Sequence, residues 1–254
     1  MSSVIYFLSD AHLGAGTAAQ ERLKRSNLEE LFGRIVRDQA GLYILGDLFD
    51  FWFEYRAVVQ REHADIIAML AGLRQAGVRV TMLAGNHDYW IGRTFTDRLG
   101  IRVVKTGLDL SLDGKRFLLA HGDGLEQGDW GYKFLLKPLL RNPLSIRLFS
   151  LLHPDLAVGF AGWFSRLSRK HLAAERDRDG GPLRQAALRL LGQGYDAVVL
   201  GHCHRPELTV DRGRTYLNLG EFFRQFTYGV YRGGALSLER IGPATGPAPA
   251  TSSH

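Results

Sequence analysis

The stretch VIYFLSDAH, residues 4–12, begins with five apolar residues and ends with Asp10 and His12. A short run of branched and aromatic residues that leads directly into a polar loop is typical of a buried β-strand. The run has no Lys or Arg before it and is too brief for a signal-peptide core or a membrane span. We therefore interpret it as a strand that carries polar side chains at its carboxyl end.

Similar apolar runs recur along the chain, each followed by a polar loop, at residues 42–45, 78–83, 117–120, 197–200 and 216–219. Segments with the helical spacing of apolar residues separate the first three runs, within residues 23–35 and 66–73. This alternation predicts an α/β layered fold with a central sheet flanked by helices. In such folds the functional groups lie in loops at the carboxyl ends of strands.

Two segments depart from the alternation. Residues 124–181 have no strand signal and are mostly helical in pattern, with interruptions at Pro138, Pro143 and Pro154. We interpret them as a helical cap inserted into a core made of residues 1–123 and 182–241. The tail, residues 242–254 (GPATGPAPATSSH), has few core-forming residues, so we expect it to be disordered.

The composition sets broad limits. A chain of 254 residues with 45% hydrophobic residues fits one large domain or a domain with an insertion, and it excludes disorder throughout. The single cysteine, Cys203, cannot form an internal disulfide, which favours a reducing compartment. The net charge of +6 is compatible with nucleic acid, acidic lipid surfaces or phosphorylated small substrates.

Five loops directly after predicted strands contain His, Asp or Asn: SDAH (9–12), GDLFD (46–50), GNHD (85–88), HGD (121–123) and GHCH (201–204). Any one of them alone is typical of an ordinary turn, because Asp and Asn favour turns and helix caps. Independent turns have no reason to place such residues after five strands of one sheet. The set therefore indicates a shared site.

The residue types indicate a metal site. Carboxylate, neutral imidazole and amide ligands suit Mn²⁺, Fe²⁺ or Zn²⁺, and the lack of partner thiolates argues against structural zinc. Two ions about 3.5–4 Å apart need a bridging carboxylate, and such pairs are the usual clamp for phosphoryl displacement.

In this order, the motifs DxH, GDxxD, GNHD, HGD and GHxH resemble those of the calcineurin-like metallophosphoesterases, and they extend from Asp10 to His204. The resemblance implies two metal ions that share Asp47 as a bridge. The implied ligands are Asp10, His12, Asp47 and His204 for one ion, and Asp47, Asn86, His121 and His202 for the other.

The same resemblance implies that a water or hydroxide shared by the ions attacks phosphorus in line. His87 would stabilise the transition state or protonate the leaving oxygen, and Asn86 and His87 would both contact substrate. We expect Asp50, Asp88 and Asp123 to orient loops or ligands by hydrogen bonds, and Cys203 to have a packing role. His63, His153 and His171 lie outside the five loops, and we interpret them as surface or cap histidines.

The predicted cap mixes large apolar residues with Lys and Arg. Its apolar stripe can simply pack on the core, with the basic residues solvated. Alternatively, a cap above a metal site offers a groove for acyl chains, and its basic residues suit a diphosphate or an anionic bilayer.

Further local motifs resemble the bacterial UDP-2,3-diacylglucosamine pyrophosphatases of lipid A synthesis. They are HGDGL (121–125), Gly128-Asp129 with Tyr132, RNPL (141–144), GDLFD with Trp52, and GHCHRP (201–206). The resemblance implies cleavage of UDP-2,3-diacylglucosamine to UMP and 2,3-diacylglucosamine 1-phosphate (lipid X), usually with Mn²⁺. It also implies a nucleotide-linked lipid as partner, peripheral contact with the cytoplasmic face of the inner membrane, no nucleic acid and no obligate protein partner.

By the same resemblance, Asp129 and Tyr132 fall where the family contacts the sugar and the cap, and Ser168, Arg169 and Lys170 lie near its polar substrate-binding cluster. One departure concerns His87, because better-known members of the family have Arg there. This departure is compatible with a divergent branch that keeps the reaction, or with an enzyme for another diphosphate.

Two other functions compete with this hypothesis. A phosphodiesterase, pyrophosphatase or nuclease for water-soluble substrates would also explain the basic charge. Nucleic-acid readers usually interleave basic residues with exposed aromatic ones, however, whereas the aromatic residues of residues 124–181 lie among leucines. A scaffold that has lost its metals is disfavoured because all seven expected ligands are present.

Overall fold

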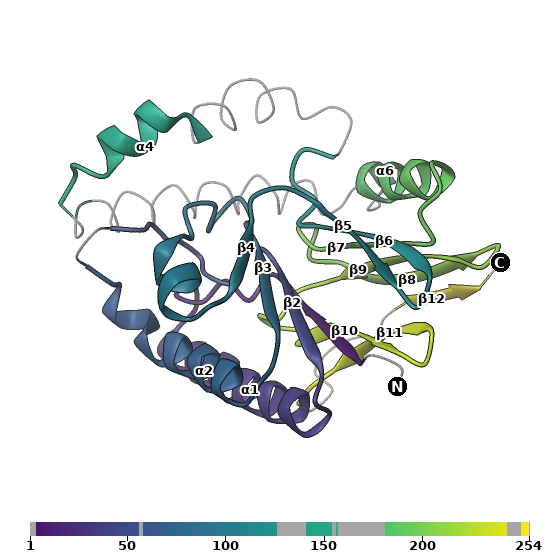
Figure 1. Cartoon of the computed structure of the whole chain (residues 1–254), viewed down its shortest axis with the longest axis horizontal. Coiled ribbons are helices and arrows are strands. Elements are labelled where there is room, and N and C mark those ends of the chain that lie inside the picture. The colour runs from purple at the N-terminus through teal and green to yellow at the C-terminus, as the bar shows by residue number, and fades with distance from the viewer. Residues whose placement is uncertain are drawn as a thin grey trace.

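The protein is described by a computed structural model that covers residues 4–55, 58–125, 141–153, 156, 181–242 and 250–253 (Figure 1). The elements of the first half are β1 (Ile5–Leu8), α1 (Ala18–Arg37), β2 (Gly41–Leu45), η1 (Arg61–His63), α2 (Ala64–Gln75), β3 (Val80–Leu83), η2 (Thr94–Arg98), β4 (Arg102–Val104), β5 (Leu108–Leu112) and β6 (Lys115–Ala120). They are followed by α4 (Pro143–Phe149), α6 (Gly181–Gly192), β7 (Ala197–Leu200), β8 (Pro206–Asp211), β9 (Arg214–Leu219), β10 (Thr227–Arg232), β11 (Ala235–Arg240) and β12 (Ala250–Ser253).

The strands form two sheets of six strands each, with the orders β11-β10-β1-β2-β3-β4 and β12-β8-β9-β7-β6-β5. In the first sheet β1 to β4 are parallel, and Leu8 pairs with Ile44 while Leu45 pairs with Leu83. In the second sheet β6 and β7 are parallel, and Ala120 pairs with Leu200. Because parallel strands end at a common edge, the loops after these strands start side by side.

Four layers enclose three apolar cores. Residues of α1 and α2 pack on one face of the first sheet, as Leu28, Leu31 and Leu70 do against Leu42 and its neighbours. The two sheets pack on each other through a second core, and α6 covers the outer face of the second sheet through a third. Figure 1 shows α1 and α2 on one side of the two sheets and α6 on the other. The layered α/β fold is therefore confirmed.

All six strands expected from the apolar runs are present, as β1, β2, β3, β6, β7 and β9. The alternation alone predicted one central sheet, whereas β1, β2 and β3 belong to one sheet and β6, β7 and β9 to the other. The resemblance to the calcineurin-like metallophosphoesterases implies central sheets in the plural, and these are present. The ends of the five loop-bearing strands nevertheless meet, since the two sheets pack face to face.

Local signals explain why α1 begins where it does. Thr17 is its N-cap: the Thr17 side chain accepts a hydrogen bond from the backbone N–H of Gln20, and the Gln20 side chain accepts one from the N–H of Thr17. This capping box satisfies two helix N–H groups that otherwise lack partners. Further along α1, Leu28, Leu31 and Ile35 recur at helical spacing and are fully buried.

The strand β10 was not expected, and its glycine explains why. A Cβ atom at Gly229 would lie 2.9 Å from Cδ2 of both Leu217 and Leu219, so a side chain there would displace leucines packed between the sheets. A glycine inside an apolar run weakens the sequence signal of a strand. Other unexpected strands, such as β5, alternate between half-buried and exposed residues at a sheet edge.

Most of the predicted cap, including residues 126–140 and 157–180, lies outside the described residues, so its boundaries stay a prediction. Within it, α4 begins after its N-cap Asn142, whose side chain accepts from the N–H of Leu144, and Pro143 occupies the first turn. No helix in the described parts of the chain is both long and apolar enough to cross a bilayer. In the tail, residues 250–253 differ from the predicted disorder, because β12 pairs in parallel with β8 at the edge of the second sheet.

His63 is not the surface or cap histidine that we expected. It is 1% exposed, and its ring lies 4.6 Å from Phe49 and 6.1 Å from Trp52 between ring centroids. Burial lowers the pKa of His63 to about 4. The folded protein therefore keeps this imidazole neutral at pH values where the unfolded chain protonates it.

This burial predicts acid sensitivity of the fold. The pKa of His63 is lower in the folded protein than its value near 6.5 in the unfolded chain. The contribution of neutral His63 to the free energy of unfolding is therefore full above pH 6.5 and is lost as the pH falls toward 4. Between pH 7.5 and 5 the free energy of unfolding should fall by about 2 kcal/mol more in the natural protein than in His63→Gln. Urea denaturation at both pH values measures this, with exposed His153→Gln as control. Equal pH dependence of the natural protein and His63→Gln would contradict it.

Candidate metal centre

The five polar loops converge at the carboxyl ends of β1, β2, β3, β6 and β7, as the sequence predicted. Five of the seven expected ligands have backbones in the left-handed region, namely Asp10 (φ 53°), His12 (φ 42°), Asp47 (φ 52°), His202 (φ 72°) and His204 (φ 56°). Side chains other than glycine rarely adopt this conformation, which typically persists where the surrounding structure holds it at a functional site.

A first cluster consists of Asp10, His12 and His204, and all three residues are buried. The Nε2 atoms of His12 and His204 lie 3.1 Å apart. Oδ1 of Asp10 lies 3.2 Å from Nε2 of His204 and 3.7 Å from Nε2 of His12, and this buried oxygen has no hydrogen-bond partner among the described residues. One carboxylate oxygen and two imidazole nitrogens that face one point form a donor set suited to a divalent cation.

A second cluster surrounds Nε2 of His121. Oδ1 of Asn86 lies 3.0 Å from this nitrogen, Nδ1 of His202 lies 3.2 Å from it, and Oδ2 of Asp47 lies 3.3 Å from it. The same Asp47 oxygen lies 3.7 Å from Nε2 of His12, which belongs to the first cluster. Asp47 thus lies between the two clusters, where a bridging ligand must be.

Backbone N–H groups orient both carboxylates. Oδ2 of Asp10 accepts a hydrogen bond from the N–H of His202 at 3.0 Å, and Oδ1 of Asp47 accepts one from the N–H of His87 at 2.9 Å. In each case the other oxygen is left to face the imidazoles. One loop therefore sets the direction of a carboxylate on another loop.

The far nitrogens of the imidazoles also have partners. Nδ1 of His121 lies 2.9 Å from the carbonyl oxygen of Leu45, so this nitrogen carries the proton and Nε2 can be a ligand. Nδ1 of His12 lies 3.5 Å from Oδ1 of Asp50, and Nδ1 of His204 lies 3.4 Å from Oε2 of Glu221. Such outer partners fix the tautomer and the ring orientation of metal-binding histidines.

Glu221 was missed by the sequence analysis, although a signal was available. It comes two residues after the last residue of β9, a strand that the apolar pattern did predict. Its place at the carboxyl end of a strand is the signal, but its loop, residues 220–226, contains no Asp or His that would mark it as a ligand loop.

Asp88 orients loops, as expected, rather than facing the clusters. Its buried carboxylate accepts hydrogen bonds from the N–H groups of Gly85 (2.8 Å), Asp47 (3.1 Å), Leu48 (2.8 Å) and Phe49 (3.5 Å). Burial and the nearby Asp47 raise the pKa of Asp88 to about 6. Asp88 thereby joins the loop after β3 to the loop after β2.

His87 faces the first cluster. Its ring meets that of His12 edge-on with centroids 4.8 Å apart, and its Nδ1 lies 2.9 Å from the carbonyl oxygen of Asp50. A ring nitrogen of His87 also lies within 4.8 Å of ligand atoms of His12 and Asp47. Burial lowers the pKa of His87, which favours the neutral ring.

Charges in the site compensate one another. Burial alone would lower the pKa of His12, but the nearby carboxylates of Asp10, Asp50 and Asp47 raise it to about 10. The pKa values of Asp10 and Asp47 are lowered by the histidines around them, although burial opposes this. Burial and the neighbouring His121 lower the pKa of His202 to about 4. Cations that bind here would release the protons of the imidazoles and take over their role of neutralising the carboxylates.

Glycine is required where the loops touch. A Cβ atom at Gly85 would lie 2.1 Å from Oδ1 of Asp47, and one at Gly201 would lie 2.5 Å from Oδ2 of Asp10. Any side chain at either position would therefore displace the carboxylate of an expected ligand.

Other residues singled out in the sequence are not part of the two clusters described above. Asp129, Tyr132, Ser168, Arg169, Lys170 and His171 are outside the described residues, so their predicted roles stay predictions. His153 is exposed, and Cys203 packs beside the third core. Oδ2 of Asp123 lies 2.9 Å from Nη2 of Arg141, so Asp123 connects the loop after β6 to the chain before α4.

Lys24 was also missed, because nothing in a helical pattern distinguishes a buried lysine from a solvated one. It is fully buried, and its Nζ donates to the carbonyl oxygens of Ala11 (3.2 Å) and His12 (2.5 Å). The same ammonium lies 2.5 Å from Oε1 of Glu21, whose carboxylate also accepts from the N–H groups of Gly14 and Gly16. Lys24 and Glu21 thus attach the loop of Asp10 and His12 to α1.

We expect Lys24→Met to loosen this loop and to weaken divalent-metal binding by about 10- to 100-fold, the range for groups that support metal ligands from outside. Titration of the metal-free protein with Co²⁺, followed by its visible absorption band, measures the affinity. Exposed Arg22→Met on the same helix is the matched control. Unchanged Co²⁺ affinity in a folded Lys24→Met protein would show that the loop keeps its shape without the ammonium.

Comparison with known proteins agrees with this geometry. The family model of the calcineurin-like phosphoesterases matches residues 3–206. The chain is 33% identical to a UDP-2,3-diacylglucosamine hydrolase of Porphyromonas gingivalis, over 95% of this chain and 98% of that protein. It is 30% identical to one of Ralstonia nicotianae (94% and 90% covered) and 31% identical to one of Pseudomonas putida (94% and 96% covered). The chain therefore belongs to the calcineurin-like phosphoesterase family of hydrolases, and it shares nearly its whole length with the UDP-2,3-diacylglucosamine hydrolases.

Proposed function

We propose that this protein hydrolyses the diphosphate of UDP-2,3-diacylglucosamine to UMP and 2,3-diacylglucosamine 1-phosphate. The observation that carries the proposal is the extent of the similarity, which covers 95% of the chain and not only the metal-binding loops. Metal loops alone are common to many phosphoesterases, whereas this similarity also spans the segment between β6 and α6, outside the metal-binding loops. Similarity that includes this segment supports a shared substrate.

We propose two divalent cations, most suitably Mn²⁺, as the cofactor. The ligand set of Asp10, His12, Asp47 and His204 for one ion, and of Asp47, Asn86, His121 and His202 for the other, is supported by the clusters around His12 and around His121. When bound, such ions polarise phosphoryl oxygens and lower the pKa of water. Oxygen and imidazole donors without thiolate suit Mn²⁺.

Two residues beside the metal clusters are proposed to act on the substrate directly, Asn86 and His87. Asn86 lies in the second cluster through Oδ1, which leaves its amide N–H₂ to donate to a phosphoryl oxygen. Nδ1 of His87 lies 2.9 Å from the carbonyl oxygen of Asp50, which fixes the direction of the ring, and burial favours its neutral form. A neutral imidazole at that point can move a proton to or from substrate.

We also propose that α4 contacts the cytoplasmic face of an anionic membrane. Leu144, Leu148 and Leu151 are 64%, 59% and 78% exposed and lie at helical spacing along α4 and just after it. Residues 141–153 contain no acidic residue and two Arg, of which Arg141 is paired with Asp123 and Arg147 lies on α4 itself. Exposed leucines next to basic residues favour the interface of an anionic bilayer. On the other side of α4, Phe149 packs at 4.8 Å from Phe53 and 5.8 Å from Trp90 between ring centroids.

The activity is tested with purified protein, Mn²⁺ and UDP-2,3-diacylglucosamine in detergent. We expect release of UMP, detected by mass spectrometry. Removal of a residue that only supports a metal ligand typically lowers metal affinity or activity 10- to 100-fold. Asp47 is an expected ligand itself, so Asp47→Asn should lower the rate by at least about 100-fold. Elemental analysis should then find fewer than two metals per chain. Asp211→Asn, at an exposed position of β8, is the control. Hydrolysis of a chromogenic phosphodiester without any release of UMP would contradict the substrate and leave the hydrolase intact.

A separate experiment tests His87. His87→Ala should lower kcat by about 10²- to 10⁴-fold, as loss of a proton-transfer group does, while both metals are retained. Steady-state kinetics and elemental analysis of the same preparation measure the two effects, and Asp47→Asn provides the pattern expected for a lost ligand. Parallel loss of activity and metal in His87→Ala would make His87 a ligand instead.

A further inference from the structure

The two chain segments that begin in the metal-binding loops after β2 and β3 continue side by side away from the metal centre. The N–H of Trp52 donates to the carbonyl oxygen of His87 at 3.3 Å, and Phe53 pairs with Trp90 in a parallel bridge. Beyond this bridge, Oε1 of Glu54 accepts from the N–H and the hydroxyl of Thr94 at 2.9 and 2.6 Å. The segments therefore lead from the expected ligands to the position of Glu54.

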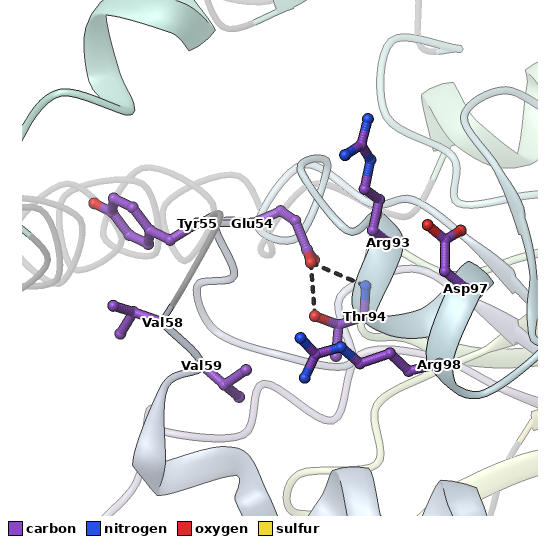
Figure 2. Close-up of a pocket in the computed structure, with 9 residues that line it drawn as sticks. Glu54, Tyr55, Val58, Val59, Arg93, Thr94, Asp97 and Arg98 are labelled. Atoms are coloured by element: carbon purple, nitrogen blue, oxygen red, sulfur yellow. Dashed lines mark hydrogen bonds between the residues drawn. The ribbon is translucent and has the colours of Figure 1, made fainter.

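At that position lies a pocket of about 810 Å³ (Figure 2). One wall comes from the segment after β2 and the other from residues around η2, with Glu54, Tyr55, Val58, Val59, Gly92, Arg93, Thr94, Asp97 and Arg98 as lining. The volume lies within the range of small-molecule sites, about 300–1,000 Å³. Glu54 is four positions after Asp50 along the chain, which limits the separation of their Cα atoms to about 13 Å.

The lining combines apolar and charged groups on opposite sides. Figure 2 shows Tyr55, Val58 and Val59 on one side, with the guanidinium of Arg98 extended toward Val59 from the other. Val58 and Val59 are 48% and 39% exposed. Within the described parts of the chain, neither Arg93 nor Arg98 forms an ion pair or a side-chain hydrogen bond, so both guanidiniums are available to a ligand.

Glu54 is fixed in place. Besides the two bonds from Thr94, its carboxylate accepts one from Nε1 of Trp52 at 3.2 Å. A carboxylate held by three donors keeps its direction, and Oε2, which accepts only one of the three bonds, retains acceptor capacity for a hydroxyl group. The pocket thus offers an apolar face, a fixed acceptor and free cationic donors within one cavity.

We propose that this pocket binds the nucleoside half of the substrate, with the base against Tyr55, Val58 and Val59. This inference rests on the proposed function. A pyrimidine has an apolar face and carbonyl oxygens that a guanidinium can reach, and a ribose has hydroxyls that a carboxylate can accept from. Acyl chains fit poorly, because four of the nine lining residues are charged and would lose solvation without gaining partners.

The test measures binding of UMP to the Mn²⁺-loaded protein by calorimetry. Arg98→Ala and Val59→Asp should each weaken UMP binding by about tenfold or more, as loss of a charge-assisted contact or of an apolar wall does. For UDP-2,3-diacylglucosamine they should lower kcat/KM at least about tenfold more than for bis(4-nitrophenyl) phosphate. Arg79→Ala, an exposed arginine just before β3 and outside the pocket, should change neither value.

Ribose 5-phosphate serves as a second probe, because it keeps the sugar and phosphate but lacks the base. The natural protein should bind it more weakly than UMP, and Val59→Asp should remove most of that difference. If both pocket variants bind UMP as the natural protein does, or if Val59→Asp weakens binding of the lipid product and not of UMP, the inference is wrong. If the natural protein releases no UMP from the lipid substrate while Arg98→Ala still weakens UMP binding, the proposed function fails and the nucleoside pocket stands.

Discussion

The metal centre depends on hydrogen bonds that cross from one loop to another and hold the carboxylates of Asp10 and Asp47 in a fixed direction. One oxygen of each carboxylate accepts a backbone N–H, from His202 or His87, and the other faces the imidazoles. Two buried carboxylates that could rotate freely would repel each other and would have to be protonated. The N–H groups instead stabilise the charged forms, and the charged form is what a divalent cation needs.

These cross-loop bonds require the loops to adopt backbones that sequences rarely choose. Left-handed residues such as Asp10, His12 and Asp47 each cost of order 1–3 kcal/mol, and the surrounding structure must supply that energy. Parallel strand pairing supplies part of it, because it brings Leu8, Ile44 and Leu83 to one edge of the sheet. The ammonium of Lys24 and the carboxylate of Asp88 supply more, since each binds several backbone groups of these loops.

The sequence predicted the strands that carry the site better than the way they assemble. Runs such as residues 4–8 and 197–200 are uniformly buried, so their apolar pattern is complete and their loops follow directly. The division into two sheets was not predictable from these runs, because an apolar run indicates a buried strand but not which strands it pairs with. The burial of three polar residues was not predicted for a related reason, because only the tertiary structure reveals it: Glu221, Lys24 and His63.

The aromatic side chains near the metal loops connect the catalytic and the lipid-facing parts of the proposed enzyme. Phe53 and Trp90 form the bridge between the segments that run from the metal centre to the pocket, and Phe149 of α4 packs on both. Through Phe149, α4 and its exposed leucines therefore contact the same two segments that carry Asp47 and Asn86. Because packed aromatic rings resist displacement, this contact gives the leucine face a defined position relative to the metal centre. A nucleotide-linked lipid needs that arrangement, since its diphosphate must reach the metals while its acyl chains stay in an apolar environment and its nucleoside stays in a polar one.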